Sequence, residues 1–335
     1  MGLVGMGLGL ASMQATAIVV GADLEGHYVE RGTGLDGIGY IEIATGDGIG
    51  SCTGTLLETG RHVLSAAHCF DSNVGVVESV NMLFFGVDEE IQIGVDRITL
   101  HPAHDEVAQG LGGEAFDLAV LELAVTAPEF VDRFALYEGN DEVLQIAQLV
   151  GFGRAGEGAV GWGELSPYGV SVTGFNRVES TGAVYEVLNA QYGFEFAVPD
   201  PDRVLLIDFD SGLEKDDAGV FLGQPDICLG VDEAHSAPGD SGGPLLIDGK
   251  IAGVASSGGN IILGGFTSDI NNVWDGTFGE LAGYTRVSAN LDWIRAQTLL
   301  TSEPVTVPML PWPALLAVGV GLFWQASGSR WARLR

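Results

Sequence analysis

The stretch Gly239-Asp240-Ser241-Gly242-Gly243-Pro244 determines how the rest of the chain is interpreted. A serine hydroxyl is a poor nucleophile at neutral pH, so it needs a base that takes its proton and donors that stabilise the resulting oxyanion. The neighbouring glycines permit strained dihedrals, which let the N–H groups of Gly239 and Ser241 converge on one point. Alone, the stretch is also compatible with an ordinary Gly-rich turn between strands. A catalytic interpretation requires a base and an acid elsewhere.

Two further segments supply these groups. Leu64-Ser65-Ala66-Ala67-His68-Cys69 places a histidine at the end of an apolar segment, and the segment from Phe116 to Leu123 carries Asp117 at the head of an apolar strand. Taken singly, His68 reads as a structural histidine and Asp117 as a turn or cap residue. Together the three segments, in the chain order His, Asp, Ser, resemble the trypsin/chymotrypsin family of serine endopeptidases.

This resemblance covers roughly residues 18 to 297 and implies an all-β fold: two six-stranded antiparallel β-barrels of the trypsin-like type with a short C-terminal helix. It implies that Ser241 attacks the scissile carbonyl of a polypeptide substrate and that His68 acts as general base and then acid. Asp117 would hold the imidazole, and the N–H groups of Gly239 and Ser241 would bind the oxyanion. The chemistry implied needs no cofactor and no metal.

The same resemblance assigns a substrate pocket. His235 stands six residues before Ser241, at the position of the pocket floor, and Ser256 and Gly258 are candidate walls. Because the floor residue is not an aspartate, a preference for Lys or Arg substrates is not supported. Entry of Asp232 or Glu233 into the pocket stays open.

The cysteines indicate whether the protein functions in an oxidising or a reducing compartment. In the resembled family, cysteines placed like Cys52 and Cys69 form a disulfide beside the catalytic histidine, and we expect that bond here. It argues for an oxidising, extracytoplasmic location. Cys228 then has no third partner, which leaves a buried thiol or an intermolecular link.

Length and composition favour one all-β domain. Of the 335 residues 46% are hydrophobic, and 51 glycines with 12 prolines predict many short strands joined by turns. The formal net charge of −31 repels phosphate backbones, which makes nucleic acid an unexpected partner.

The long segment 155–225 is interpreted as enlarged surface loops around short strands such as Tyr185–Leu188 and Val204–Phe209. The carboxylates between Asp208 and Asp217 alternate in a way that suggests calcium, but they do not match an EF-hand, and a solvated acidic turn is favoured. His101 and His104 are read as part of the approach to Asp117 rather than as a metal site. Residues 288–297 predict the closing helix, with Ser288 as its N-cap.

The N-terminal residues 1–17 are apolar and uncharged and end in small residues, which is typical of a signal peptide. A membrane anchor or a buried first strand is the alternative. The following Ile18-Val19-Val20-Gly21 resembles the family's activated N-terminus. We therefore expect the ammonium of a new N-terminus at Ile18 to pair with Asp240.

Residues 298–335 form a linker, an apolar segment and a basic end. Val305 to Trp324 contains no charged residue in 20 positions, which is long enough for one membrane span. Arg330, Arg333 and Arg335 follow, so the protease domain would face away from the cytoplasm. The tail resembles PEP-CTERM sorting signals, which implies a sorting transpeptidase as partner and at least transient membrane anchoring. A C-terminal helix packed on the domain is the alternative.

The function expected from the sequence is an exported serine endopeptidase that works through an acyl-enzyme intermediate. The alternative is a protease-like binding module without turnover. The presence of all three triad residue types favours the enzyme.

Overall fold

The computed structural model describes residues 18–104, 114–165, 168–193, 200–222, 228–260, 262–263 and 266–299. All of them except Leu299 belong to one compact unit. The expected signal peptide and the apolar tail segment Val305 to Trp324 lie outside the described residues. Among the described residues, no helix is both long and apolar enough to cross a membrane.

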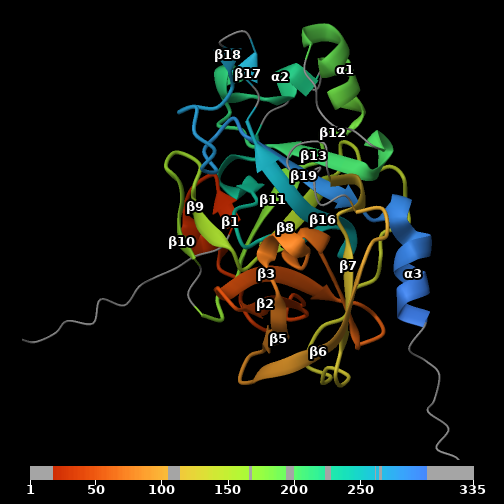
Figure 1. Ribbon diagram of the computed structural model, residues 1–335. Coiled ribbons are helices and arrows are strands. Elements are labelled where there is room, and N and C mark those ends of the chain that lie inside the picture. Colours follow the sequence, from red (N-terminus) through yellow and green to blue (C-terminus); the bar gives the residue numbers. More distant parts are fainter. Residues whose placement is uncertain are drawn as a thin grey trace, which may run out of the picture. The chain divides into compact units, whose positions relative to one another are not determined.

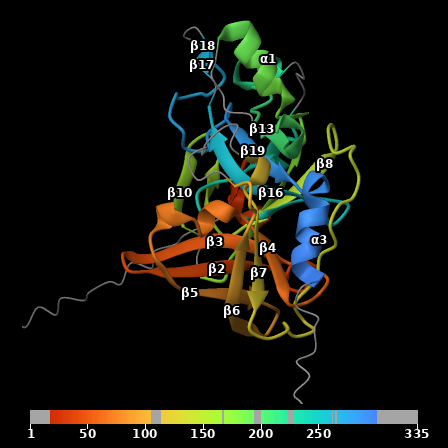
Figure 2. The ribbon, with the colours of Figure 1, turned by 45° about the vertical axis from the view of Figure 1, so that its right-hand side comes forward.

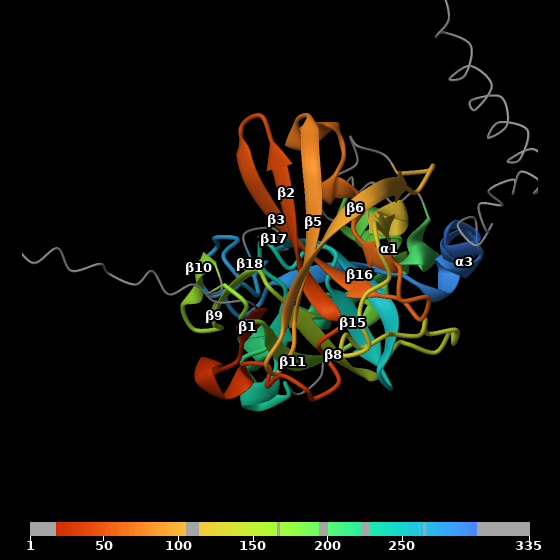
Figure 3. The same ribbon diagram turned by 90° about the horizontal axis from the view of Figure 1, so that it is seen from below.

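Six antiparallel strands close into a barrel, drawn in orange to yellow in Figure 1. Alternation explains why they form strands: in the first of them, Ile41 and Ile43 are buried, whereas Tyr40, Glu42 and Ala44 are half-buried. In Figure 3 the strand Ile38–Thr45 lies beside its partners Gly48–Leu56 and Val77–Phe85, as their pairing requires. Around the barrel the order is β2 (Ile38–Thr45), β3 (Gly48–Leu56), β4 (His62–Ser65), β7 (Ala119–Leu123), β6 (Glu90–Leu100) and β5 (Val77–Phe85).

The second half of the fold is an open sheet of seven strands. It buries its own apolar cluster, which includes Leu149, Leu245 and Tyr284. The all-β, trypsin-type fold is confirmed, with one closed barrel and a half-barrel in place of a second closed one. The sheet order is β11 (Val172–Arg177), β8 (Ile146–Gly151), β15 (Pro244–Ile247), β16 (Lys250–Gly259), β19 (Leu281–Arg286), β13 (Val204–Asp208) and β12 (Ser180–Thr181).

A smaller sheet ties the start of the described chain to the Ser241 region. Its order is β10 (Gly161–Leu165), β9 (Arg154–Glu157), β1 (Ile18–Val20) and β14 (Ala234–His235). β1 runs parallel to β9 and antiparallel to β14, with Val19 opposite His235. A separate two-stranded sheet pairs β17 (Ile262–Leu263) antiparallel with β18 (Phe266–Thr267).

The described α-helices are α1 (Ala183–Tyr192), α2 (Gly219–Leu222) and α3 (Leu291–Leu299), and Figure 2 shows α1 and α3 on different sides of the fold. The expected strand Tyr185–Leu188 is wrong, because it lies in α1. Tyr185 and Leu188 are buried three positions apart, which places both on one helix face. The expected strand from Val204 is confirmed as β13.

The closing helix is confirmed as α3, but its expected cap is wrong. Ser288 is the first residue of a 3-10 turn, Ser288–Asn290, that precedes α3, and the residue at the N-cap position of that turn is Val287. The Ser288 hydroxyl donates instead to Oε1 of Glu142, at 2.6 Å. This contact ties the start of the closing helical segment to the buried Glu142 carboxylate.

Candidate active site

Strand pairing brings His68 and Asp117 to the same end of the barrel. β4 pairs with β7 so that Ser65 lies opposite Ala119. His68 follows β4 in a 3-10 turn, Ala67–Cys69, and Asp117 comes just before β7. The disulfide between Cys52 of β3 and Cys69 fastens this turn to the barrel, with 6.4 Å between the two Cα atoms.

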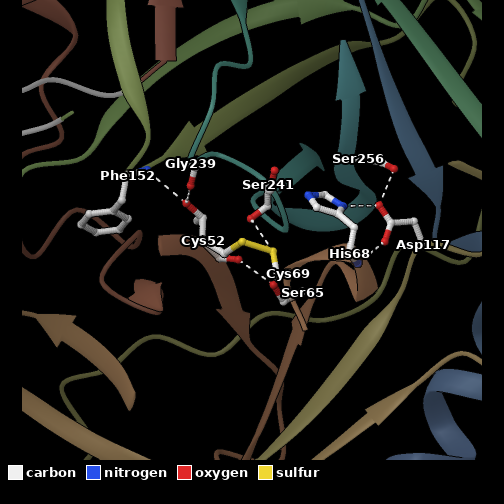
Figure 4. Close-up of a disulfide and its surroundings, with 10 residues drawn as sticks. Cys52, Ser65, His68, Cys69, Asp117, Phe152, Gly239, Ser241 and Ser256 are labelled. Carbon is white, nitrogen blue, oxygen red and sulfur yellow. Dashed lines mark hydrogen bonds and ion pairs between the residues drawn. A yellow bond between two sulfur atoms is a disulfide. The ribbon is translucent and has the colours of Figure 1, made fainter. Parts of the chain in front are cut away.

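The Asp117 carboxylate is held by three hydrogen bonds (Figure 4). Oδ2 lies 2.6 Å from Nδ1 of His68 and accepts the hydroxyl of Ser256 at 2.5 Å. Oδ1 accepts the backbone N–H of His68 at 2.8 Å. The carboxylate thus fixes both the ring and the main chain of His68.

Burial and charge act in opposite directions on this pair. Burial alone lowers the pKa of His68, but the Asp117 charge and hydrogen bond outweigh it, so the pKa is raised. Burial likewise raises the pKa of Asp117, but His68 and the hydrogen bond from Ser256 reverse the shift and lower it. The geometry therefore favours an ionised carboxylate beside an imidazole that readily accepts a proton.

Ser241 stands in a tight loop between β14 and β15. Gly239 and Gly242 have φ values of +100° and +82°, a region that other residues rarely adopt. A Cβ on Gly242 would stand 2.0 Å from Oγ of Ser65, so packing requires glycine there as well. The loop is tied to the barrel by Thr53, whose N–H donates to the Ser241 carbonyl at 2.8 Å and whose hydroxyl donates to the Gly239 carbonyl at 3.0 Å.

The N–H groups of the loop divide into two sets. Those of Asp240, Gly242 and Gly243 donate to carbonyls within the fold. Among the described residues, those of Gly239 and Ser241 have no such acceptor. They are the donors that an oxyanion site would need.

His68, Asp117 and Ser241 all line one cavity of about 680 Å³. In Figure 4 the imidazole of His68 lies between the side chains of Ser241 and Asp117. The structure therefore brings together the three residues expected to form the triad.

Two of the three expected pocket residues line the cavity, and the third lies behind one of them: Cε1 of His235 is 3.6 Å from where a Cβ on Gly258 would be. Ser256 and Gly258 line the cavity, but His235 does not and is fully buried. Burial lowers the pKa of His235 to about 4, so its ring is neutral at pH 7. Trp274, which the sequence did not single out, lines the cavity, and its Nε1 is 3.1 Å from where a Cβ on Gly258 would be.

Ile18 and Asp240 meet in the interior. The backbone nitrogen of Ile18 lies 3.3 Å from Oδ2 of Asp240, which is fully buried. The carboxylate also accepts N–H groups of Ala237 and Gly153, each at 2.8 Å. Burial outweighs these bonds and raises the pKa of Asp240 to about 7.

A second group of carboxylates lies elsewhere, where a solvated acidic turn was expected. Asp208, Asp210 and Glu233 are buried, and one oxygen of each lies within 4.8 Å of the others, so the group could hold a metal ion. Asp208 accepts the N–H of Gly219 and Glu233 that of Asp210. The expected solvated turn is therefore only partly right: Gly212 to Lys215 are exposed, but Asp208, Asp210, Asp216 and Asp217 are buried.

Comparison with known proteins is consistent with this geometry. The family model described as Trypsin matches residues 40–188, which include His68 and Asp117. Chymotrypsin-C from Bos taurus is 28% identical over 256 residues, 75% of this chain and 79% of the relative. A trypsin from Simulium vittatum is 26% identical over 216 residues, 62% of this chain and 70% of the relative. An uncharacterized peptidase from Corynebacterium glutamicum (strain R) is 26% identical over 248 residues, 74% of this chain and 64% of the relative.

Proposed function

We propose that this chain, a trypsin-like serine-type endopeptidase, is exported and cuts polypeptides with Ser241 as nucleophile, His68 as general base and Asp117 as the residue that orients His68. The observation that carries the assignment is the 2.6 Å contact between Nδ1 of His68 and Asp117, in the same cavity as Ser241. With Nδ1–H donated to Asp117, the other ring nitrogen is the one that takes the proton of Ser241.

The site electrostatics support this sequence of steps. The Asp117 charge and hydrogen bond that raise the pKa of His68 also stabilise the imidazolium that forms when Ser241 attacks the carbonyl. The proton then passes to the leaving amine, and water repeats the attack on the acyl-enzyme. The oxyanion formed in each step would accept hydrogen bonds from the N–H groups of Gly239 and Ser241.

A fluorophosphonate probe tests the assignment. It should label the folded wild-type protein and fail to label Ser241→Ala, and His68→Ala should be labelled at least about 10³-fold more slowly. If folded, mature wild type is not labelled, the chain is the alternative, a protease-like binding module without turnover.

We further propose that removal of residues 1–17 activates the enzyme by freeing the nitrogen of Ile18. Ile18 has a φ of +53°, a strained value for a β-branched residue inside a chain. Cleavage before Ile18 removes that constraint and converts an amide into an ammonium beside the buried Asp240. A cation there offsets the burial that otherwise disfavours the carboxylate.

N-terminal sequencing of the active species tests this step. We expect Ile18 as the first residue, and an active species with any other first residue contradicts it. As a matched pair, a chain beginning at Ile18 should be active, whereas one with a single extra alanine before Ile18 should lose most activity, because its ammonium is displaced.

We also propose that residues 298–335 anchor the precursor in a membrane and serve a sorting transpeptidase. The support is the uncharged run Val305 to Trp324 followed by three arginines. Fractionation tests it: the full-length chain should be found with membranes, and a chain ending at Gln297 should be soluble and active. A freely soluble full-length precursor refutes the proposal.

A further inference from the structure

The cavity that contains Ser241 is lined from two directions. On one side it is lined by Ser256 of β16 and by Trp274, and on the other by the end of the hairpin that joins β2 and β3. Figure 4 shows Ser256 and the Cys52–Cys69 disulfide on opposite sides of the His68 ring. The expected substrate pocket occupies only the first of these sides.

The path of the proton assigns the hairpin side to the leaving half of the substrate. His68 gives its proton to the leaving amine, so the chain after the cut passes the His68 ring. Cys69 follows His68, and its Sγ lies 3.9 Å from the carbonyl oxygen of Ser241. From Cys52, the disulfide partner of Cys69, β3 leads back to Ile49 over about 10 Å. An extended peptide covers that length with about three residues.

The hairpin presents an apolar side chain to this part of the cavity. Ile49 lines the cavity although it is 71% exposed, and Ile43 and Val74 line it as well. Because Ile49 is so exposed, the fold itself gains little from its apolar surface. That surface is buried only when a substrate covers it.

Two glycines keep the hairpin side open. Gly50 pairs with Ile43, and among the described residues a Cβ on Gly50 would have only the Ile43 carbonyl oxygen within 4 Å, at 3.9 Å. A Cβ on Gly48 would have no described atom within 4 Å. The φ of Gly50 is not in the left-handed region, so its backbone does not require glycine. The absent side chain therefore leaves space beside Ile49 for a substrate.

We propose that the surface formed by Ile49, Ile43 and Val74, and kept open by Gly50, is a subsite for an apolar side chain within the first three residues after the cut. The inference rests on the proposed function, because it needs a substrate that is cut at Ser241. Contact with Ile49 removes apolar surface of both partners from water, which favours binding. The substrates are polypeptides with Leu, Ile, Val or Phe shortly after the scissile bond.

Two kinds of substrate test this subsite in the mature enzyme. The first is a peptide library that varies one of the three positions after the cut, and the second is a chromogenic amide with no amino acid after the cut. For wild type, kcat/KM should be about 10-fold higher with Leu than with Gly at one of these positions. Ile49→Ala should reduce this Leu-to-Gly ratio to about 2, and Ile49→Leu should keep it.

Gly50→Val tests the open space. The added methyl groups occupy the space beside Ile49, so the Leu-to-Gly ratio should fall roughly 10-fold or more below that of wild type. Gly163→Val is the matched control. Gly163 of β10 also has no left-handed φ, and its Cβ would stand 3.7 Å from the carbonyl oxygen of Ala155, but it does not line the cavity. Its library profile should coincide with that of wild type.

The amide separates this inference from the proposed function. If folded, mature wild type cuts neither the amide nor the library, the proposed function fails. If the amide is cut but the Leu-to-Gly ratio is the same in wild type, Ile49→Ala and Gly50→Val, the subsite is overturned and the function stands. An equal loss on both kinds of substrate in Ile49→Ala overturns it too, because Ile49 would then be structural. So does a preference for Lys or Arg after the cut that Asp47→Asn removes.

Discussion

The backbone nitrogen of Ile18 and the carboxylate of Asp240 meet 3.3 Å apart although 222 positions separate them in the sequence. The parallel pairing of β1 with β9 and its antiparallel pairing with β14 hold Ile18 in that place. At this contact the buried carboxylate meets an uncharged amide N–H. A cation there would stabilise the carboxylate charge more strongly. The contribution of this contact to the free energy of unfolding therefore depends on pH and on whether residues 1–17 are attached.

A chain that retains residues 1–17 should lose stability as the pH rises from about 4 to about 7. The pKa of Asp240 is about 7 in the folded protein and near 4 when unfolded, so the folded state binds more protons in that window. Stability then falls with pH, by up to about 1.4 kcal/mol per unit. Urea unfolding of wild type and Asp240→Asn at pH 5 and pH 8 measures the difference.

The comparison isolates Asp240. Glu280, whose burial raises its pKa to about 7, and His235, whose pKa is lowered, are common to both proteins and cancel. Asp248→Asn, at an exposed turn between β15 and β16, should keep the wild-type pH dependence. Equal pH slopes for wild type and Asp240→Asn would contradict the prediction.

Asp117→Asn should cost much more activity than Ser256→Ala. An amide in place of the carboxylate cannot hold the His68 tautomer, so kcat should fall on the order of 10⁴-fold. Ser256→Ala removes one of several bonds to Asp117 and should cost about 10-fold. Initial rates on a chromogenic peptide measure both, with circular dichroism to verify folding. An Asp117→Asn enzyme within tenfold of wild type would refute the orienting role.

The disulfide should stabilise the fold by about 3 kcal/mol, because the loop that it closes restricts the conformations of the unfolded chain. Its two cysteines are 17 positions apart. The double variant Cys52→Ala/Cys69→Ala should therefore unfold at lower urea than oxidised wild type. Under reducing conditions the two proteins should converge. A difference that persists after complete reduction would show that side-chain packing, not the cross-link, is responsible.

The local chemistry of the site was predictable, whereas its tertiary surroundings were not. Ser241, His68 and Asp117 each stand in a segment whose residue pattern points to its role. The helix at Tyr185 was missed because a short apolar run fits a strand or a helix equally, and tertiary burial selects one. The His104–Asp71 contact joins residues 33 positions apart through side chains alone, so no local sequence pattern predicts it.

The same limit applies to the substrate pocket. Counting residues back from Ser241 gives His235, but exposure depends on what packs over that position, and the structure buries it. Trp274 comes from a loop after β18 that has no repeating pattern. Which residues line the cavity depends on how the loops fold over the sheet, and the spacing of apolar residues along the sequence does not determine that.

The pocket predicts a preference for uncharged side chains before the cut. The uncharged residues Ser236, Ser256, Ser257 and Trp274 line the cavity. Among the described residues, the acids that line the cavity are Asp47, in the β2–β3 turn, and Asp117, which is already bonded to His68. The exposed carboxylate of Asp47 would be a weak, solvent-screened counter-charge, so a lysine or arginine in the cavity would lose more hydration than it regains.

A peptide library with one varied position before the cut measures this preference. We expect kcat/KM for uncharged residues to exceed that for Lys and Arg by about 10²-fold or more. Trp274→Ala removes a side wall and should raise kcat/KM for Phe and Tyr relative to Ala by roughly 10-fold, because each added methylene contact in a pocket is worth about 1–3 kcal/mol. Trp293→Ala is the matched control, since Trp293 packs on His101 and does not line the cavity. Efficient cleavage after Arg, or an unchanged profile in Trp274→Ala, would show that another group forms the pocket.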